Sequence, residues 1–201
     1  MATDIATIIR NIESFHDLEG KTVIHVGAGG GQFIAYAART SGVLAVDSDP
    51  EAVQRLRSAV RAQALEERIE VVEADFLALH RRADLVFFEF CLHEIADPAA
   101  ALSHALTLAP QTLVADPAPE SRWAWYCGEE DKARRSWAAV ERSRVLKSAS
   151  FQGVQRFHDY AELHAKIGTQ GEPTLTRIEE FRDRLDFTIE MPYRMALLAA
   201  R

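Results

Sequence analysis

Five small residues interrupt an apolar stretch in VIHVGAGGGQFI, residues 23–34. Gly27, Gly29 and Gly31 follow a predicted strand and precede a predicted helix. Glycine has no Cβ, so its backbone can turn sharply and a ligand can approach it closely. A turn of this kind is compatible with a dinucleotide, with S-adenosylmethionine or with tight packing alone.

Carboxylates follow the next two predicted strands. Asp47 ends the run VLAVD and can accept hydrogen bonds from both hydroxyls of an adenosine ribose. After the third strand, Asp75 can accept from the exocyclic amine of adenine, and Phe76 can cover the face of the ring. The ends of three consecutive strands therefore offer a glycine turn for one end of a cofactor, a hydrogen-bond acceptor for its ribose, and an acceptor with an aromatic ring for its adenine.

Candidates for catalysis lie around the end of the fourth predicted strand, residues 84–90. His93 can act as the base for a hydroxyl, thiol or ammonium if its pKa is close to the working pH; the alternative is a local hydrogen bond at a helix start. Glu89 can contact the substrate or the amino-acid end of a cofactor if its side chain faces that way. Cys91 lacks the Pro-Cys context of nucleophilic cysteines and is expected to be buried.

A metal site is the next possibility, because Glu89 and Asp116 end adjacent predicted strands. Hard cations need several converging oxygen ligands. The Asp-Asn pair typical of metal-assisted catechol-type enzymes is missing, since Pro117 follows Asp116. We therefore expect no metal.

Aromatic residues cluster after residue 117 and suggest a substrate wall. Trp123, Trp125 and Tyr126 can bind a planar acceptor or a cationic amine. The alternative is that they pack this segment onto the core.

The elements that must position these residues alternate between strands and helices. Apolar residues at helical spacing predict a helix near residues 4–17, and further helices are expected around 52–60 and 99–108. Short apolar runs without clean alternation predict buried parallel strands. These runs cover residues 23–26, 43–46, 69–73, 84–90 and 112–115. The pattern predicts an α/β fold with a doubly wound, mostly parallel, seven-stranded Rossmann-like sheet.

Asp-Pro pairs predict where three segments begin, at residues 49–50, 97–98 and 116–117, because the acid can cap free N–H groups and proline suits a first turn. We expect one domain over residues 1–201, with a cofactor-binding core at 18–117. A helical, aromatic-rich insert at 118–184 follows the fifth strand, with helices near 159–168 and 173–184. Residues 185–201 form two final strands, with Met191–Pro192 near their turn.

These motifs together resemble the class I S-adenosylmethionine-dependent methyltransferases, small-molecule branch, over residues 20–116. The resemblance implies that Gly27, Gly29 and Gly31 pass the methionine end, that Asp47 holds the ribose, and that Asp75 and Phe76 flank adenine. The set of cofactor-binding residues is completed by Ala28, Ser48, Phe90 and His25.

His25 departs from that family, which usually has an acid two residues before the first glycine. Imidazole titrates near neutrality, so His25 can change cofactor affinity or its pH dependence. The alternative is a buried strand residue with a backbone partner.

Composition limits the partners. The chain has 201 residues and a formal net charge of −7, which argues against strong sequence-independent binding to nucleic acid phosphates. It has no apolar run of about 18 residues and no signal pattern, so we expect a cytoplasmic protein that does not enter membranes. A homodimer is left open.

The expected function is methyl transfer from S-adenosylmethionine to an oxygen, nitrogen or sulfur atom of a small, partly apolar molecule. One alternative is a non-catalytic cofactor-binding or partner subunit with the same fold, because fold alone does not establish chemistry. The other is an NAD-dependent oxidoreductase, whose glycine fingerprint would need glycine at Gln32.

Overall fold

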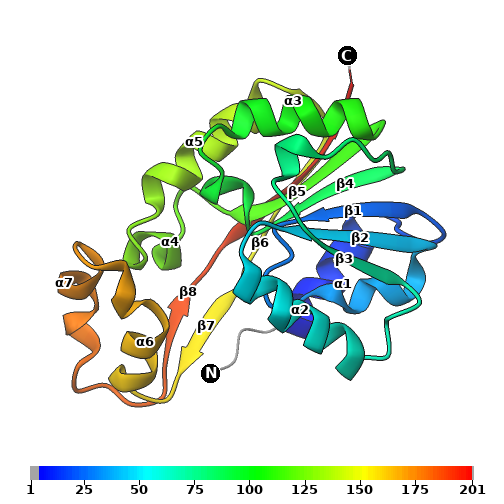
Figure 1. Ribbon diagram of the computed structural model, residues 1–201. Helices are drawn as coiled ribbons and strands as arrows, with labels where there is room; N and C mark the ends of the chain where they lie inside the picture. Colours follow the sequence, from blue (N-terminus) through cyan, green and yellow to red (C-terminus); the bar gives the residue numbers. More distant parts are fainter. Residues whose placement is uncertain (1–4, 201) are drawn as a thin grey trace.

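A seven-stranded sheet forms the centre of the computed structural model, which describes residues 5–200. Its strand order is β3-β2-β1-β4-β5-β9-β6, as the fan of strands in Figure 1 shows. Neighbouring strands among β1 to β5 run parallel, whereas β9 runs antiparallel to both β5 and β6. The expected doubly wound, mostly parallel α/β sheet is confirmed.

Most strands of this sheet are short and apolar, whereas β6 is longer and mostly exposed. Their bounds are β1 Thr22–Val26, β2 Gly42–Asp47, β3 Ile69–Glu73, β4 Leu85–Glu89, β5 Gln111–Pro117, β6 Arg144–Phe151 and β9 Tyr193–Ala199. The core strands β4 and β5 are almost wholly buried, as expected for parallel strands that are covered on both faces.

Helices cover both faces of the sheet (Figure 1). The helices α1 (Ile5–Phe15) and α2 (Pro50–Ala62) pack on one face, together with the 3-10 helix η1 (Ile34–Arg39). On the other face lie α3 (Pro98–Leu108) and α5 (Glu130–Glu141). Each face has its own cluster of buried apolar side chains. The carboxyl ends of β1 to β5 therefore meet at one edge between two packed layers.

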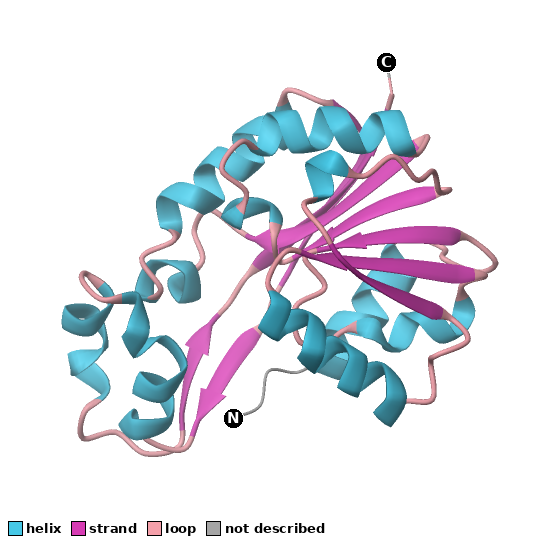
Figure 2. Cartoon of the chain, viewed as in Figure 1, coloured by secondary structure: helices cyan, strands magenta, loops and turns pink. Residues whose placement is uncertain are grey.

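The remaining elements form a small lobe beside the sheet, at lower left in Figure 2. Two antiparallel strands, β7 (Val154–Phe157) and β8 (Phe187–Glu190), pair there with each other. The helices of this part are α4 (Arg122–Tyr126), α6 (Tyr160–Ile167) and α7 (Thr174–Ile178). Its apolar interior is continuous with the cluster under α1 and α2.

Most expected elements appear at the expected places. The helix expected at 4–17 is α1, although position 4 lies outside the described residues. Asp49 and Asp97 cap α2 and α3 by accepting from backbone N–H groups, as their Asp-Pro pairs predicted. The helices near 159–168 and 173–184 correspond to α6 and to α7 with a following 3-10 turn.

Three details differ from the sequence analysis. The pair Asp116–Pro117 ends strand β5 and opens no helix. The segment after the glycine turn forms only the 3-10 helix η1. Residues 144–157, expected within a helical insert, form β6 and β7, so β6 instead of β8 completes the large sheet. Among residues 5–200, no helix combines the length and apolar character needed to cross a bilayer.

Candidate active site

The glycine turn after β1 is held by the neighbouring strand ends. The Gly27 N–H donates to the Val46 carbonyl at 2.8 Å, and the Gly29 N–H donates to Asp47 Oδ2 at 2.8 Å. Gly27 has a φ of 63°, and a Cβ added there would lie 2.5 Å from the Cβ of Cys91. Only glycine fits this backbone without moving the loop after β4.

A pocket of about 460 Å³ opens at these strand ends. Six residues expected to bind a cofactor line it: Gly27, Asp47, Ser48, Asp75, Phe76 and Phe90. Ala28, Gly29 and Gly31 belong to the same turn but do not line the pocket. Six of the thirteen lining residues were thus predicted from the sequence as cofactor-binding residues.

The apolar side of the pocket differs in detail from the expectation. Phe76 is buried and makes edge contacts with Phe88 and His104, so it anchors its loop. The next residue, Leu77, is 44% exposed and lines the pocket, as does Ile95. No sequence signal distinguished Leu77 from Phe76, because both are apolar and adjacent.

Cys91, which was expected to be buried, is half-buried and lines the pocket as a neutral thiol. Its Sγ donates to the Val26 carbonyl at 3.0 Å. Burial raises the pKa of this thiol well above its ordinary value, and the nearby Asp116 and Glu89 carboxylates raise it further. Cys91 is therefore unsuited to act as a nucleophile.

His25 forms a buried polar cluster with Tyr36 and Glu89 on the α1 face of the sheet. The Tyr36 hydroxyl lies 3.0 Å from His25 Nδ1, and His25 Nε2 lies 3.7 Å from Glu89 Oε2. Burial raises the pKa of Glu89, although the adjacent His25 acts in the opposite direction. Among the described residues, His25 Nε2 and Glu89 Oε1 have no hydrogen-bond partner. His25 therefore has a side-chain partner in place of the backbone partner that we considered.

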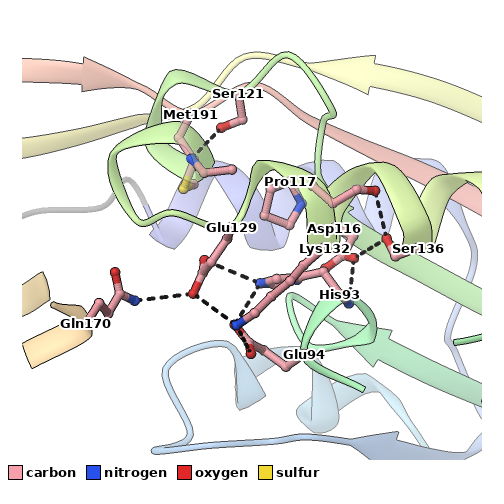
Figure 3. A network of polar contacts seen from close by, with 12 residues as sticks. His93, Glu94, Asp116, Pro117, Ser121, Glu129, Lys132, Ser136, Gln170 and Met191 are labelled. Atoms are coloured by element: carbon pink, nitrogen blue, oxygen red, sulfur yellow. Dashed lines mark hydrogen bonds and ion pairs between the residues drawn. The ribbon is translucent and has the colours of Figure 1, made fainter. Parts of the chain in front are cut away.

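His93 lies on the other side of the strand ends, within the network of Figure 3. Its Nδ1 lies 2.7 Å from Asp116 Oδ1, and its backbone N–H donates to Asp116 Oδ2 at 3.0 Å. The Ser136 hydroxyl also donates to Asp116 Oδ2, at 2.8 Å. Asp116 is completely buried, so the imidazole edge that carries Nδ1 is fixed.

Carboxylates surround the second nitrogen of His93. Burial alone would lower the pKa of His93, but Asp116, Glu129 and Glu94 raise it to about 12. The protonated ring has no lone pair with which to accept a proton. This differs from the pKa near the working pH that a general base requires, and we do not retain His93 as a base.

The three expected aromatic residues lie in the insert, and none of them lines the pocket at the strand ends. Trp123 is buried and stacks on Phe157. The hydroxyl of Tyr126, also buried, hydrogen-bonds Glu180. Trp125 is 37% exposed beneath the guanidinium of Arg177. Their contacts favour the packing alternative.

A different aromatic group adjoins the pocket. Phe90 lines the pocket and contacts the rings of Phe33 and Tyr193, with centroids 5.7 and 5.4 Å away. Tyr193 in turn stacks on Phe151, and its hydroxyl accepts a hydrogen bond from Asn11 of α1. This group, Phe33, Phe90, Phe151 and Tyr193, brings together four distant parts of the chain, which is why the sequence analysis found only Phe90.

Comparison with known proteins identifies a methyltransferase domain in this chain. Residues 23–110 match the family described as a methyltransferase domain. A search of curated protein sequences finds no match.

Many solved structures share the fold. A provisionally named methyltransferase from Bacillus halodurans has a TM-score of 0.69 and 16% identity, and the match covers 98% of each chain. A SAM-dependent methyltransferase from Aquifex aeolicus has a TM-score of 0.58 and 18% identity, over 98% of this chain and 90% of that one. Magnesium protoporphyrin IX methyltransferase from Synechocystis, solved with bound SAM, has a TM-score of 0.55 and 13% identity, over 96% and 77%. At such identities the likeness shows a common fold.

We expect Asp116→Asn to destabilise the fold, because it removes the charge that neutralises the buried His93. Breaking a buried pair in this way costs about 3–5 kcal/mol, measurable as the free energy of unfolding in urea. The control is Asp131→Asn, which breaks an exposed ion pair with Arg134 and costs about 0–1 kcal/mol. Equal losses in the two variants would show that the His93–Asp116 pair does not stabilise the fold.

Proposed function

We propose that this chain, whose residues 23–110 match a methyltransferase domain and whose fold is that of solved methyltransferases, transfers the methyl group of S-adenosylmethionine to a small, partly apolar acceptor. One observation carries the proposal: the pocket at the strand ends shares Phe90 with an adjoining aromatic group. An acceptor bound against those rings would lie beside the cofactor pocket.

The polar groups of the pocket suit an adenosine. Asp47 accepts one backbone N–H at each oxygen, from Gly29 and Asp49, and a carboxylate has further lone pairs for ribose hydroxyls. Asp75 is exposed, and its Oδ1 accepts from the Leu77 N–H, so Oδ2 can accept from an adenine amine. Leu77 and Ile95 supply apolar contacts for the ring.

The glycine turn offers room for the rest of the cofactor. A Cβ added at Gly29 would meet only the Gly27 carbonyl, at 3.9 Å, so the space above this backbone is open. S-adenosylmethionine supplies a sulfonium whose methyl group is electrophilic. The protein's task is then to hold the donor and the acceptor in line and to exclude water.

Glu89 is the residue proposed to receive the cationic amino group of the cofactor. The Glu89 side chain is 5% exposed, and its Oε1 lacks a hydrogen-bond partner among the described residues. His25 occupies the position where the family usually has an acid, two residues before Gly27. The negative charge therefore comes from β4 in place of β1, at the adjacent strand end.

Some acceptors need no general base, because in-line displacement on a sulfonium depends chiefly on positioning. The neighbouring carboxylates keep the pKa of His93 too high for a base, and burial keeps Cys91 a thiol. An acceptor that attacks through a neutral amine or a preformed anion suits such a site.

The first test uses Glu89→Gln and two ligands. S-adenosylhomocysteine carries the amino-acid end, whereas 5′-methylthioadenosine lacks it. We expect the variant to bind S-adenosylhomocysteine about 10- to 100-fold more weakly, because a hydrogen bond to a charged group contributes about 1.5–3 kcal/mol. Affinity for 5′-methylthioadenosine should stay within about twofold, as measured by calorimetry. An equal loss for both ligands would remove Glu89 from the amino-acid end.

The second test identifies the acceptor class. The wild-type protein is incubated with radiolabelled methyl donor and with small alcohols, thiols and amines, beside tRNA, DNA and protein. We expect label only in an apolar small molecule. Label in nucleic acid or protein alone would contradict the proposal, and a protein that binds the cofactor but labels nothing would support a non-catalytic subunit.

Variants test whether the acceptor lies against the aromatic group that adjoins the pocket. Phe33→Ala should lower acceptor kcat/KM about tenfold or more, in line with the loss of one buried aromatic contact, while affinity for S-adenosylhomocysteine is retained. Trp125→Ala is the control, because Trp125 contacts Tyr126 and Arg177 and belongs neither to the pocket lining nor to the aromatic group around Phe90. The reverse result would place the acceptor against the insert.

A further inference from the structure

Three potential metal ligands converge behind the pocket, where the methyl-transfer chemistry uses none of them. They are His93 Nε2, Glu94 and Glu129, and their ligand atoms all lie within 4.8 Å of one another. His93 and Glu94 belong to the 3-10 turn after β4 (Leu92–Glu94), whereas Glu129 immediately precedes α5. Figure 3 shows these side chains pointing toward one another from the two segments.

The orientation of His93 is fixed independently of the two glutamates. Asp116 accepts from the backbone N–H of His93 and lies 2.7 Å from its Nδ1. Ser136 in turn donates to Asp116. A histidine that binds a metal almost always donates its other N–H to a carboxylate or carbonyl in this way, which fixes the tautomer and aims the free nitrogen. Nε2 is therefore directed at Glu94 and Glu129 by a partner outside the set of ligands.

The spacing around Nε2 suits a metal ion better than a hydrogen bond. Nε2 lies 3.4 Å from Glu94 Oε1 and 3.7 Å from Glu129 Oε2. Both distances exceed the roughly 2.7–3.2 Å of an ordinary N–H···O bond. Two ligands on a tetrahedral zinc ion, each bonded at about 2.0–2.2 Å, are about 3.4 Å apart.

Lys132 leaves the inner carboxylate oxygens available. Its Nζ lies 2.7 Å from Glu94 Oε2 and 3.9 Å from Glu129 Oε1, whereas the oxygens nearest His93 Nε2 are Glu94 Oε1 and Glu129 Oε2. A divalent ion beside a neutral imidazole, together with Lys132, would balance the three carboxylates of Asp116, Glu94 and Glu129. A protonated imidazole with Lys132 leaves one negative charge uncompensated.

We propose that His93, Glu94 and Glu129 bind one divalent transition-metal ion of the zinc class. Binding replaces the proton on Nε2, which passes to solvent, and Nδ1 keeps its proton toward Asp116. The ion joins the turn after β4 to the start of α5. Glu94 also lines the cofactor pocket, so the pocket provides a route of entry for the ion.

Sequence alone predicted no metal, because Glu89 and Asp116 were the candidate ligands at adjacent strand ends. Glu129 lies in the insert, 35 positions after Glu94 in the chain, and no local spacing connects the two. In the folded chain, Asp116 supports the ligand His93 and is not itself among the three converging groups.

The test is a zinc titration of the metal-free protein in competition with a chromophoric chelator, without cofactor or acceptor. We expect one zinc ion per chain and a rise in Tm on binding. Glu129→Gln should weaken zinc binding by about 10- to 100-fold or more, since it replaces a charged ligand. The matched control is Glu130→Gln, because Glu130 pairs with Arg177 instead; its zinc affinity should equal that of the wild type.

Absence of stoichiometric zinc binding to the wild-type protein would overturn the proposal, and so would equal zinc affinities of Glu129→Gln and the wild type. If Glu129→Gln does not fold, Glu94→Gln replaces it, because Glu94 is exposed. Substitution with cobalt gives a second readout, since a tetrahedral site absorbs visible light strongly. None of these measurements depends on methyl transfer, so their failure would leave the proposed acceptor untouched.

Discussion

The site depends on two hydrogen bonds that the Asp47 carboxylate accepts from backbone N–H groups. One oxygen receives the N–H of Gly29 and the other receives the N–H of Asp49. This residue therefore fixes the glycine turn after β1 to the end of β2 and to the start of α2. Gly27 then lies against Cys91, which brings the loop after β4 into the same wall. The pocket exists because three strand ends are tied at this point.

Four buried titratable side chains surround that edge and separate into two pairs. His25 and Glu89 lie on the α1 face of the sheet, and His93 and Asp116 lie toward α5. A buried charge is tolerated only when it is paired, so each carboxylate has a histidine beside it. The first pair keeps an unpartnered oxygen that suits a cationic ligand. In the second pair, Asp116 contacts both the backbone N–H and Nδ1 of His93 and orients the imidazole toward the insert.

Local chemistry made much of this predictable. Short apolar runs identified β1 to β5, and the caps at Asp49 and Asp97 identified two helix starts. The predictions that were wrong concerned residues whose surroundings are set by distant parts of the chain. The strand character of β6 arises from pairing with β9, and its side chains are mostly exposed, so no apolar run marks it. The surroundings of His93 likewise depend on Glu129 from the insert, which changed its expected role from base to cation.

The most direct test of the account is the affinity for S-adenosylhomocysteine of the wild type and of Asp47→Asn, measured by calorimetry beside NAD. Loss of the charged acceptor should weaken binding by about 10- to 100-fold, from the contribution of hydrogen bonds to a charged group. The control Glu51→Gln, on the exposed first turn of α2, should bind as the wild type does. Unchanged affinity in Asp47→Asn, or tighter binding of NAD than of S-adenosylhomocysteine, would contradict the account.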